Sequence, residues 1–383
     1  MPTLITGSSM VSCAGDLDST YEALLAGRSG VARLDYGDPA KLNVHFAYGI
    51  TDPAADTAAG TRLAGHWLSR CIAEALREAG VDPAERRVAV VVGTGLRELR
   101  AVEQWHADGA ELRLAQLHFD EVVRAVAPEV TEVHTVANAC AASGYALALA
   151  ADLLELGEAD AVVAAGCDAM TESMLTVIGR VTETPSDMVR PFDADRRGVL
   201  LGEGAVAVVL ERSDTRAGSG GRPVLGVLRG VGLGCDAYHE TAPDRAGIVA
   251  TMLDAHRRAG VREDDIGFVV AHGTSTALND PTEAEALLEV FGADGPPVTA
   301  IKGAIGHTSG SAALMSLLVA LEAIRTGSVP PVVGLRTPAP EAEKLNLVCG
   351  APVTTRSRVA QVNAFGFGGV NAVMIVEADD AGQ

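Results

Sequence analysis

The chain has 383 residues, 48% of them hydrophobic, and carries a formal net charge of −20. A chain of this length buries a large core, and its 42 glycines favour two closely packed halves over independent domains. The strong negative charge excludes nucleic acid as an expected partner, because phosphate backbones bind basic surfaces.

The sequence also bounds location and redox chemistry. It has no run of 18 apolar residues and no basic N-terminal segment followed by an apolar core, so we expect no membrane span and no secretory signal. The six cysteines lie far apart without any Cys-x-x-Cys spacing, which argues against a zinc or redox motif. We therefore expect a cytoplasmic protein with reduced thiols and no metal site.

In chain order, the first chemical signal is Cys140, within residues 135–144, Thr-Val-Ala-Asn-Ala-Cys-Ala-Ala-Ser-Gly. A β-branched, apolar stretch stops there, and the small residues that follow as far as Leu156 predict a buried helix. A thiol at a helix N-terminus meets free N–H groups and the positive end of the helix dipole, which favour thiolate over thiol. Cys140 is therefore a candidate nucleophile; the alternative is a buried cysteine that packs as a small hydrophobic residue.

Further along the chain, the Gly- and Ser-rich segment 217–222 predicts a short linker between two halves, and the acidic tail after Glu377 predicts disorder. Two strand-like, apolar runs after this linker end at His272 and His307, each surrounded by glycine, serine and threonine. A lone histidine is more often structural than catalytic, but α/β proteins place their chemistry on loops at strand ends. Both histidines are therefore candidate site residues.

Parts of the two halves resemble each other. Residues 140–144 align with residues 306–310 at an offset of 306 − 140 = 166, and the same offset places the strand-like segment 202–211 on 368–377. A third match, between residues 93 and 273, has an offset of 273 − 93 = 180, so the first half carries 180 − 166 = 14 extra residues before Cys140. We predict two copies of one βα unit, with Cys140 and His307 at corresponding helix starts near a pseudo-twofold axis.

Several short motifs together resemble one known family, the β-ketoacyl synthases, which are condensing enzymes with the thiolase-like fold. These motifs occur in the family's order along nearly the whole chain: 4–7, 24–30, 138–144, 190–193, 202–204, 272–276, 279–280, 302, 306–307 and 363–369. The resemblance implies an α/β, thiolase-like fold in which two pseudo-symmetric βα halves pack as α-β-α-β-α layers. Residues 1–216 would form the half that carries Cys140, and residues 222–383 the half that carries His272, Lys302 and His307.

The resemblance also implies roles for individual residues. Cys140 would accept an acyl group from a carrier thioester, as a covalent intermediate requires. His272 and His307 would stabilise the negative charge that develops on the thioester oxygen of a malonyl-type extender. Lys302 would lie behind the histidines and pair with the carboxylate of Glu283; the alternative is that Glu283 belongs to a solvated helix face.

A second group of residues would bind the substrates. The backbone N–H groups of Cys140 and Phe367 would form an oxyanion hole, although the glycine run around Phe367 is also compatible with a plain turn. Thr274 and Thr276 would hold the phosphopantetheine arm. Arg196 and Arg197 are candidates for docking an acidic acyl carrier protein, or they simply neutralise the neighbouring aspartates.

The chain departs from the usual family pattern in three places. The segment 95–140 is short and has Leu-Arg-Glu-Leu-Arg at 96–100, the segment 170–190 is abbreviated, and Val370 stands where the family usually has threonine. In relatives the first of these segments helps to form the acyl pocket and the dimer interface. The acyl chain and the extender unit are therefore not predicted.

The function that the resemblance implies is an elongating, Cys-His-His type β-ketoacyl synthase of fatty-acid or type II polyketide assembly, with specialised metabolism favoured. One alternative is an enzyme on the same fold that loads, transfers or releases acyl groups without elongation. Another is a non-catalytic subunit that sets chain length for an active sister chain. We expect no bound cofactor, and substrates carried on the phosphopantetheine of an acyl carrier protein or of coenzyme A. We also expect a homodimer, or a heterodimer with a homologous chain-length-type subunit. No nucleic-acid or membrane partner is expected.

Overall fold

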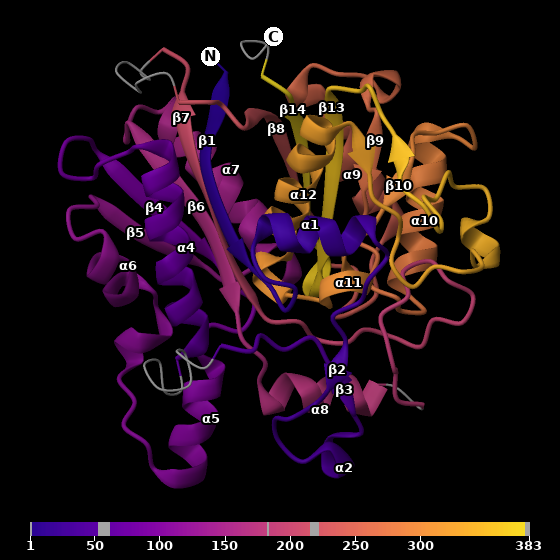
Figure 1. The fold of residues 1–383 in the computed structure, drawn as a ribbon, viewed down its shortest axis with the longest axis horizontal. Helices are drawn as coiled ribbons and strands as arrows, with labels where there is room; N and C mark the ends of the chain where they lie inside the picture. The colour runs from indigo at the N-terminus through magenta and orange to yellow at the C-terminus, as the bar shows by residue number, and fades with distance from the viewer. Residues whose placement is uncertain (1, 53–61, 182–183, 215–221, 380–383) are drawn as a thin grey trace.

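The computed structural model describes residues 2–52, 62–181, 184–214 and 222–379 (Figure 1). Its main sheet has the strand order β10-β9-β13-β14-β8-β1-β7-β6-β4-β5. The first half of the chain contributes five of these strands: β1 (Thr3–Val11), β4 (Val88–Gly93), β5 (Glu132–Val136), β6 (Ala161–Asp168) and β7 (Gly204–Arg212). The second half contributes the other five: β8 (Gly226–Cys235), β9 (Phe268–Val270), β10 (Val298–Thr299), β13 (Val359–Gly366) and β14 (Val370–Glu377).

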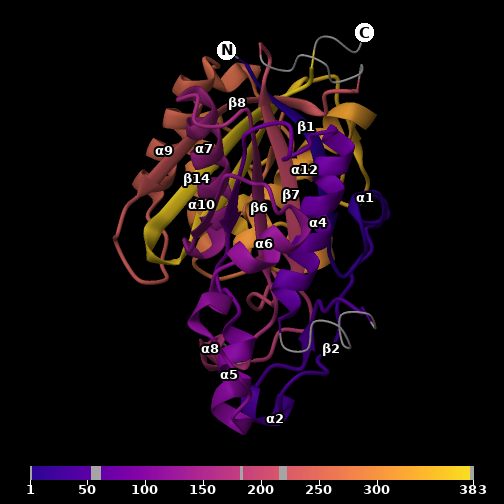
Figure 2. The same ribbon diagram turned by 90° about the vertical axis from the view of Figure 1, so that its left-hand side faces the viewer.

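Helices separate and cover the two halves of this sheet (Figures 1 and 2). Helix α4 (Leu63–Ala79) packs on β1, β6 and β7, and α9 (Arg245–Ala259) packs on β8 and β14 with α10 (Asn279–Phe291) beside it. Helices α7 (Ala142–Glu155) and α12 (Ala312–Thr326) contact each other and strands of both halves. The layers are therefore α-β-α-β-α, which confirms the thiolase-like architecture expected from the sequence.

Shorter elements complete the fold. Helices α5 (Leu99–Asp108), α8 (Glu172–Val181) and α2 (Pro39–Leu42) project from one end of the layered body (Figure 2). Helix α6 (Asp120–Val126) packs beside α4, and α1 (Leu17–Leu25) lies near α11 (Lys302–Ile305) and α12. Two small ladders pair β2 (Ala32–Arg33) with β3 (Phe46–Ala47) and β11 (Ser328–Val329) with β12 (Val353–Thr354).

Sequence patterns account for the buried strands and the helix ends. β4 and β6 are buried along their whole length, and their continuous apolar runs are typical of parallel strands covered on both faces. In α9, the side chain of Asp244 accepts a hydrogen bond from the N–H of Gly247 at the first turn. The same helix ends at Gly260, whose φ of 66° is the left-handed conformation that glycine adopts without strain.

The strand registers show the duplication directly. Asp168 of β6 lies opposite Gly204 of β7, and Gly366 of β13 lies opposite Val370 of β14. Gly204 of β7 and Val370 of β14 are separated by 370 − 204 = 166 positions, the offset predicted from the sequence. Asp168 and Gly366 therefore occupy equivalent positions at the ends of equivalent strands.

The helix starts follow a different offset, so one expectation was wrong. Ala139 and Ser309 both have positive φ, 46° and 51°, and each begins a 3-10 turn that leads into α7 or α12. Their separation is 309 − 139 = 170, so Cys140 corresponds to Gly310 and not to the residue before His307. The difference of four arises after the turn, because Ala139 and Gly204 are 204 − 139 = 65 positions apart whereas Ser309 and Val370 are 370 − 309 = 61 apart.

Two further expectations concern segments at the limits of the described residues. Residues 217–221 of the expected linker and residues 380–383 of the acidic tail lie outside them.

Within the described part of the chain, no helix combines the length and apolar character needed to cross a membrane. In the same part, no three His, Cys, Asp or Glu side chains are grouped so that they could hold a metal ion.

Candidate active site

Cys140 lies in a cavity of about 460 Å³ between the two halves. The cavity is also lined by His272, His307 and Phe367. The short turn that carries Cys140 precedes α7, and the positive φ of Ala139 turns the chain sharply from β5 into that helix. The structure thus brings together a thiol from the first half and two imidazoles from the second.

Two opposing influences act on the Cys140 thiol. Burial raises its pKa to about 11, although the charge of Lys302 and the N–H of Phe367 act in the opposite direction. The position at a helix start is as predicted, but removal of the sulfur from water outweighs the stabilisation that this position gives to a negative charge.

The two histidines lie edge to face, with ring centroids 5.3 Å apart and an interplanar angle of 83°. Nζ of Lys302 lies 3.3 Å from Nδ1 of His272, and the backbone N–H of Ser309 donates to Nδ1 of His307 over 3.3 Å. Because Nδ1 accepts a hydrogen bond in both rings, the ring hydrogen of each lies on Nε2. Burial and the positive charge of Lys302 lower the pKa of both histidines well below the usual value, so both rings are neutral donors.

Lys302 and Glu283 lie behind His272, but they do not pair in the way the resemblance implied. Nζ of Lys302 donates to the carbonyl oxygen of His272, and burial lowers the pKa of this lysine to about 8. The Glu283 carboxylate accepts the backbone N–H groups of His272 and Gly273, both over 2.8 Å. In the part of the chain that the structure describes, no ion pair within 4 Å joins the two charges, because the peptide of His272 lies between them.

The two threonines lie along the same cavity. Thr274 and Thr276 place their hydroxyl oxygens 2.9 Å apart, and both line the cavity wall. The backbone N–H of Thr274 donates to the buried carboxylate of Asp280, which fixes the loop after β9. At the opposite wall Phe367 is 46% exposed, and its backbone N–H faces the Cys140 sulfur.

Arg196, one of the two candidates for carrier docking, makes its contacts within the chain. Its guanidinium forms an ion pair with Glu341 and donates to the carbonyl oxygens of Asp193 and Thr276, and only 14% of its side chain is exposed. These contacts hold loops of the chain together. Arg196 and Arg197 both line the cavity, but Arg197 is the exposed one of the two.

The comparison with protein families decides the identity of this site. Residues 2–216 match the family model described as "Beta-ketoacyl synthase, N-terminal domain", and residues 225–336 match "Beta-ketoacyl synthase, C-terminal domain". The chain belongs to the β-ketoacyl synthase family. Enzymes of this family are acyltransferases that catalyse the decarboxylative condensation of an acyl group with a malonyl-type extender, and this is the activity of the synthase described here.

Individual relatives agree with this assignment. The synthase is 34% identical over 318 residues to "Nodulation protein E" of Rhizobium meliloti (strain 1021), an alignment that covers 79% of each chain. It superimposes on a chain of "The ishigamide ketosynthase/chain length factor" with a TM-score of 0.88, 30% identity and 99% coverage of both chains. A β-ketoacyl synthase from Burkholderia phymatum STM815 is similar at a TM-score of 0.88, 25% identity and 99% coverage of both chains. A type II polyketide ketosynthase in complex with its acyl-carrier protein, which is 20% identical with a TM-score of 0.86 and 99% coverage of both chains, shares the fold.

The sequence did not reveal the carboxylate that joins the two halves of the synthase. Asp168 is buried at the end of β6 and accepts hydrogen bonds from the hydroxyl of Thr94 and the N–H groups of Gly95, Leu96 and Gly310. Burial raises the pKa of Asp168 to about 6, and the four donors act against this shift. The available signal in the sequence was the acidic residue Asp168 directly after the apolar run of β6. A buried strand such as β6 ends where loops of both halves meet, so an acidic residue there can accept hydrogen bonds from both.

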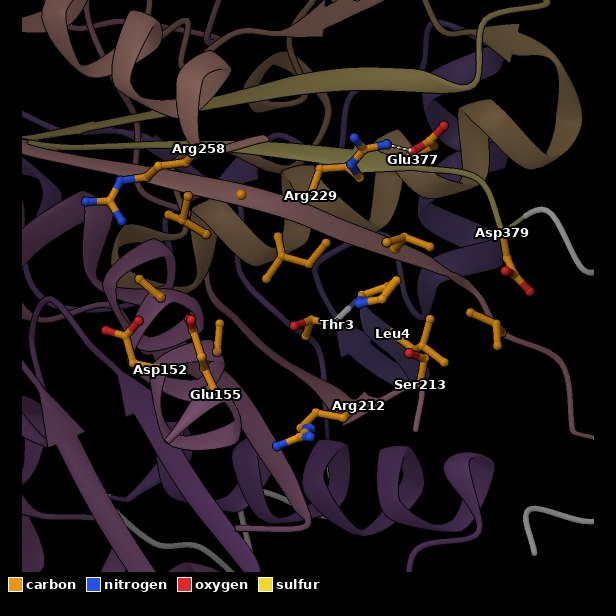
Figure 3. A pocket seen from close by; sticks show the side chains of 18 of the residues that line it. Thr3, Leu4, Asp152, Glu155, Arg212, Ser213, Arg229, Arg258, Glu377 and Asp379 are labelled. Carbon is orange, nitrogen blue, oxygen red and sulfur yellow. Dashed lines mark hydrogen bonds and ion pairs between the residues drawn. The ribbon is translucent and has the colours of Figure 1, made fainter. Parts of the chain in front are cut away.

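A larger hollow of about 1260 Å³ lies elsewhere on the synthase, between α7, β8 and the start of β1 (Figure 3). Each of its arginines is neutralised within the chain: Arg229 pairs with Glu377, Arg258 with Asp254 and Arg212 with Asp214. Its lining includes neither a histidine nor a cysteine. The chemistry therefore belongs to the smaller cavity that contains Cys140.

Proposed function

We propose that Cys140 is the residue that carries the growing acyl chain. Its sulfur attacks the carbonyl carbon of an acyl thioester, the bond to the carrier sulfur breaks, and the thiol proton passes to that leaving sulfur. Backbone N–H groups of Cys140 and Phe367 hold the carbonyl oxygen while it is negative. The observation that supports this role is the position of the Cys140 sulfur, which lies in the cavity that contains both histidines and within reach of the N–H of Phe367.

The two histidines then act on the extender. A malonyl thioester places its thioester oxygen between the two Nε2–H groups, and loss of carbon dioxide leaves an enolate whose charge these donors stabilise. The enolate carbon attacks the acyl carbonyl on Cys140, and the product leaves with two additional carbons. The Cys140 thiolate released in this step takes a proton from water. Neutral imidazoles suit this role because they donate without offering an acidic proton to the enolate.

Substrates reach the site on a phosphopantetheine arm, which passes Thr274 and Thr276 along the cavity. An acyl carrier protein brings the arm, and Arg197 at the cavity mouth contributes to docking its acidic surface. We propose a dimer, either of two identical chains or with a homologous chain-length-type subunit, in specialised fatty-acid or polyketide assembly. The structural neighbours that contain a chain length factor and an acyl-carrier protein support these partners.

Intact-mass measurement with a panel of acyl carrier thioesters and malonyl carrier protein tests this function. The wild type is expected to gain the acyl mass and to release a β-keto product two carbons longer, whereas Cys140→Ala gains no mass. His307→Ala is expected to acylate but to lose most condensation. Acylation without elongation by the wild type would support a loading or transfer enzyme, and no acylation would support a non-catalytic partner subunit.

A further inference from the structure

A buried line of hydrogen bonds connects α9 to the active site. Nε2 of His256 lies 2.6 Å from Oε1 of Gln361, Nε2 of Gln361 donates to Oδ1 of Asn363 over 2.8 Å, and Nδ2 of Asn363 donates to Oε1 of Glu283 over 3.1 Å. All four side chains are buried, with exposed fractions from 0% to 4%. The line ends at the carboxylate that holds the backbone of His272 and Gly273.

The direction of this line is fixed at its active-site end. The Glu283 carboxylate only accepts hydrogen bonds, so Asn363 must present its NH₂ group there and its oxygen to Gln361. Gln361 must then present its NH₂ group to Asn363 and its oxygen to His256. His256 therefore carries its hydrogen on Nε2, and its other nitrogen, Nδ1, is buried and has no hydrogen-bond partner in the described part of the chain.

The geometry of β13 explains why these residues act together. Gln361 and Asn363 are two apart on one strand, so both side chains point to the same face, toward α9 and α10. Removing either amide would leave a donor or an acceptor of the neighbouring side chain unpaired, which is costly because these side chains are buried. A change at His256 or Gln361 thus reaches the peptide of His272 without contacting substrate.

We propose that His256 and Gln361 are positioning residues of the synthase, which orient Asn363 and Glu283 and thereby aim the imidazole of His272 at the extender. This inference rests on the proposed role of His272. It predicts that the decarboxylation half-reaction depends on His256 and Gln361, whereas acyl transfer to Cys140 does not, because the oxyanion hole at Cys140 and Phe367 lies outside the line.

The decisive variant is Gln361→Glu, which keeps the shape of the side chain but replaces the NH₂ group facing Asn363 with an acceptor. We expect kcat for malonyl carrier protein decarboxylation to fall about tenfold or more, with KM and the rate of Cys140 acylation within about twofold of the wild type. Gln361→Met and His256→Leu should each lower kcat for decarboxylation about three- to tenfold. The double variant should lower it little further than either single variant, because both changes interrupt one line of hydrogen bonds. His256→Gln, which still offers an N–H to Gln361, should recover much of the loss.

Thr251→Val provides the matched control, because Thr251 is buried on the same helix and its hydroxyl bonds only within α9, to the carbonyl oxygen of Gly247. Melting temperatures of all variants report general destabilisation. The inference is overturned if Gln361→Glu decarboxylates at the wild-type rate, or if acylation and decarboxylation fall together in proportion to the loss of stability. His272→Ala separates the two proposals: if it decarboxylates at the wild-type rate, the proposed role of His272 fails first.

Discussion

The charge of Lys302 is predicted to control decarboxylation across a narrow pH range. Nζ of Lys302 lies 3.3 Å from Nδ1 of His272. An enolate oxygen that accepts a normal hydrogen bond from Nε2 of the same ring is therefore about 8 Å from the Lys302 charge. One unit charge at this distance, with an effective dielectric constant of about 20, stabilises an enolate by about 2 kcal/mol, or about 30-fold in rate. Because burial lowers the pKa of Lys302 to about 8, the ammonium is present below that pH and is lost above it.

The expected result is a fall of about 30-fold in the rate of carbon dioxide release from malonyl carrier protein as the pH rises from about 6.5 to about 9.5. Lys302→Met should show no inflection near pH 8 and should react at the rate of the high-pH limb of the wild type. The Cys140 thiol, with its pKa raised to about 11, does not contribute in this range.

Stability provides an independent readout of the same lysine. The pKa of Lys302 in the folded state lies below the usual lysine value of 10.5, so the folded state binds fewer protons than the unfolded state between about pH 8 and that value. The free energy of unfolding of the wild type, relative to Lys302→Met, should therefore increase as the pH rises through this window. A Lys302→Met enzyme with the wild-type rate at neutral pH, or with the same inflection, would refute the electrostatic argument.

The remaining predictions use other parts of the site. Arg197→Glu should raise KM for acyl carrier protein about tenfold while the rate with a small pantetheine thioester stays unchanged; Arg196→Gln should instead lower the melting temperature, because it breaks the contact with Glu341. Asp168→Asn should lower the free energy of unfolding by about 1–3 kcal/mol in urea titrations, because an amide cannot accept all four of the hydrogen bonds at that position. Gly366→Asp should fold but fail to acylate Cys140, as intact mass would show.

The resemblance to the β-ketoacyl synthases predicted the layered fold and the grouping of Cys140 with two histidines, and the internal repeat independently indicated that Cys140 and His307 lie near each other. The sequence did not predict properties that depend on distant partners. Arg196 is removed from the surface by Glu341, which lies 145 residues away. The raised pKa of Cys140 has burial as its largest cause, and a local motif does not encode burial between two halves of a chain.

The relation between Lys302 and Glu283 illustrates a finer limit. The family resemblance implied that the two charges lie near each other, but not that the peptide of His272 lies between them. The offset of the helix starts failed for a similar reason. The two halves differ by four residues between this turn and the paired strand, and a length difference of this size leaves no periodic signal in the sequence.

The pseudo-symmetry explains why only one half holds a reactive turn. In one copy, the strand-end residue Asp168 accepts a hydrogen bond of 2.6 Å from the N–H of Gly310, which lies in the turn of the other half. In the second copy the equivalent strand-end residue is Gly366, and a side chain there would begin 3.2 Å from the backbone nitrogen of Cys140.

The backbone does not require glycine at this position, because Gly366 has a φ of −113°, which any residue adopts. The lack of a side chain therefore leaves room beside the Cys140 N–H, where the proposed oxyanion hole would place a substrate oxygen in the position that a carboxylate occupies in the first half. Gly366→Asp would place a carboxylate there and fill the proposed oxyanion hole.

The added Cβ also meets a methyl group of Val370 at 2.8 Å, so Gly366→Ala combined with Val370→Ala is the control that relieves crowding without adding an acceptor. Acylation by the control and not by Gly366→Asp would show that the empty position, and not the turn alone, makes Cys140 reactive.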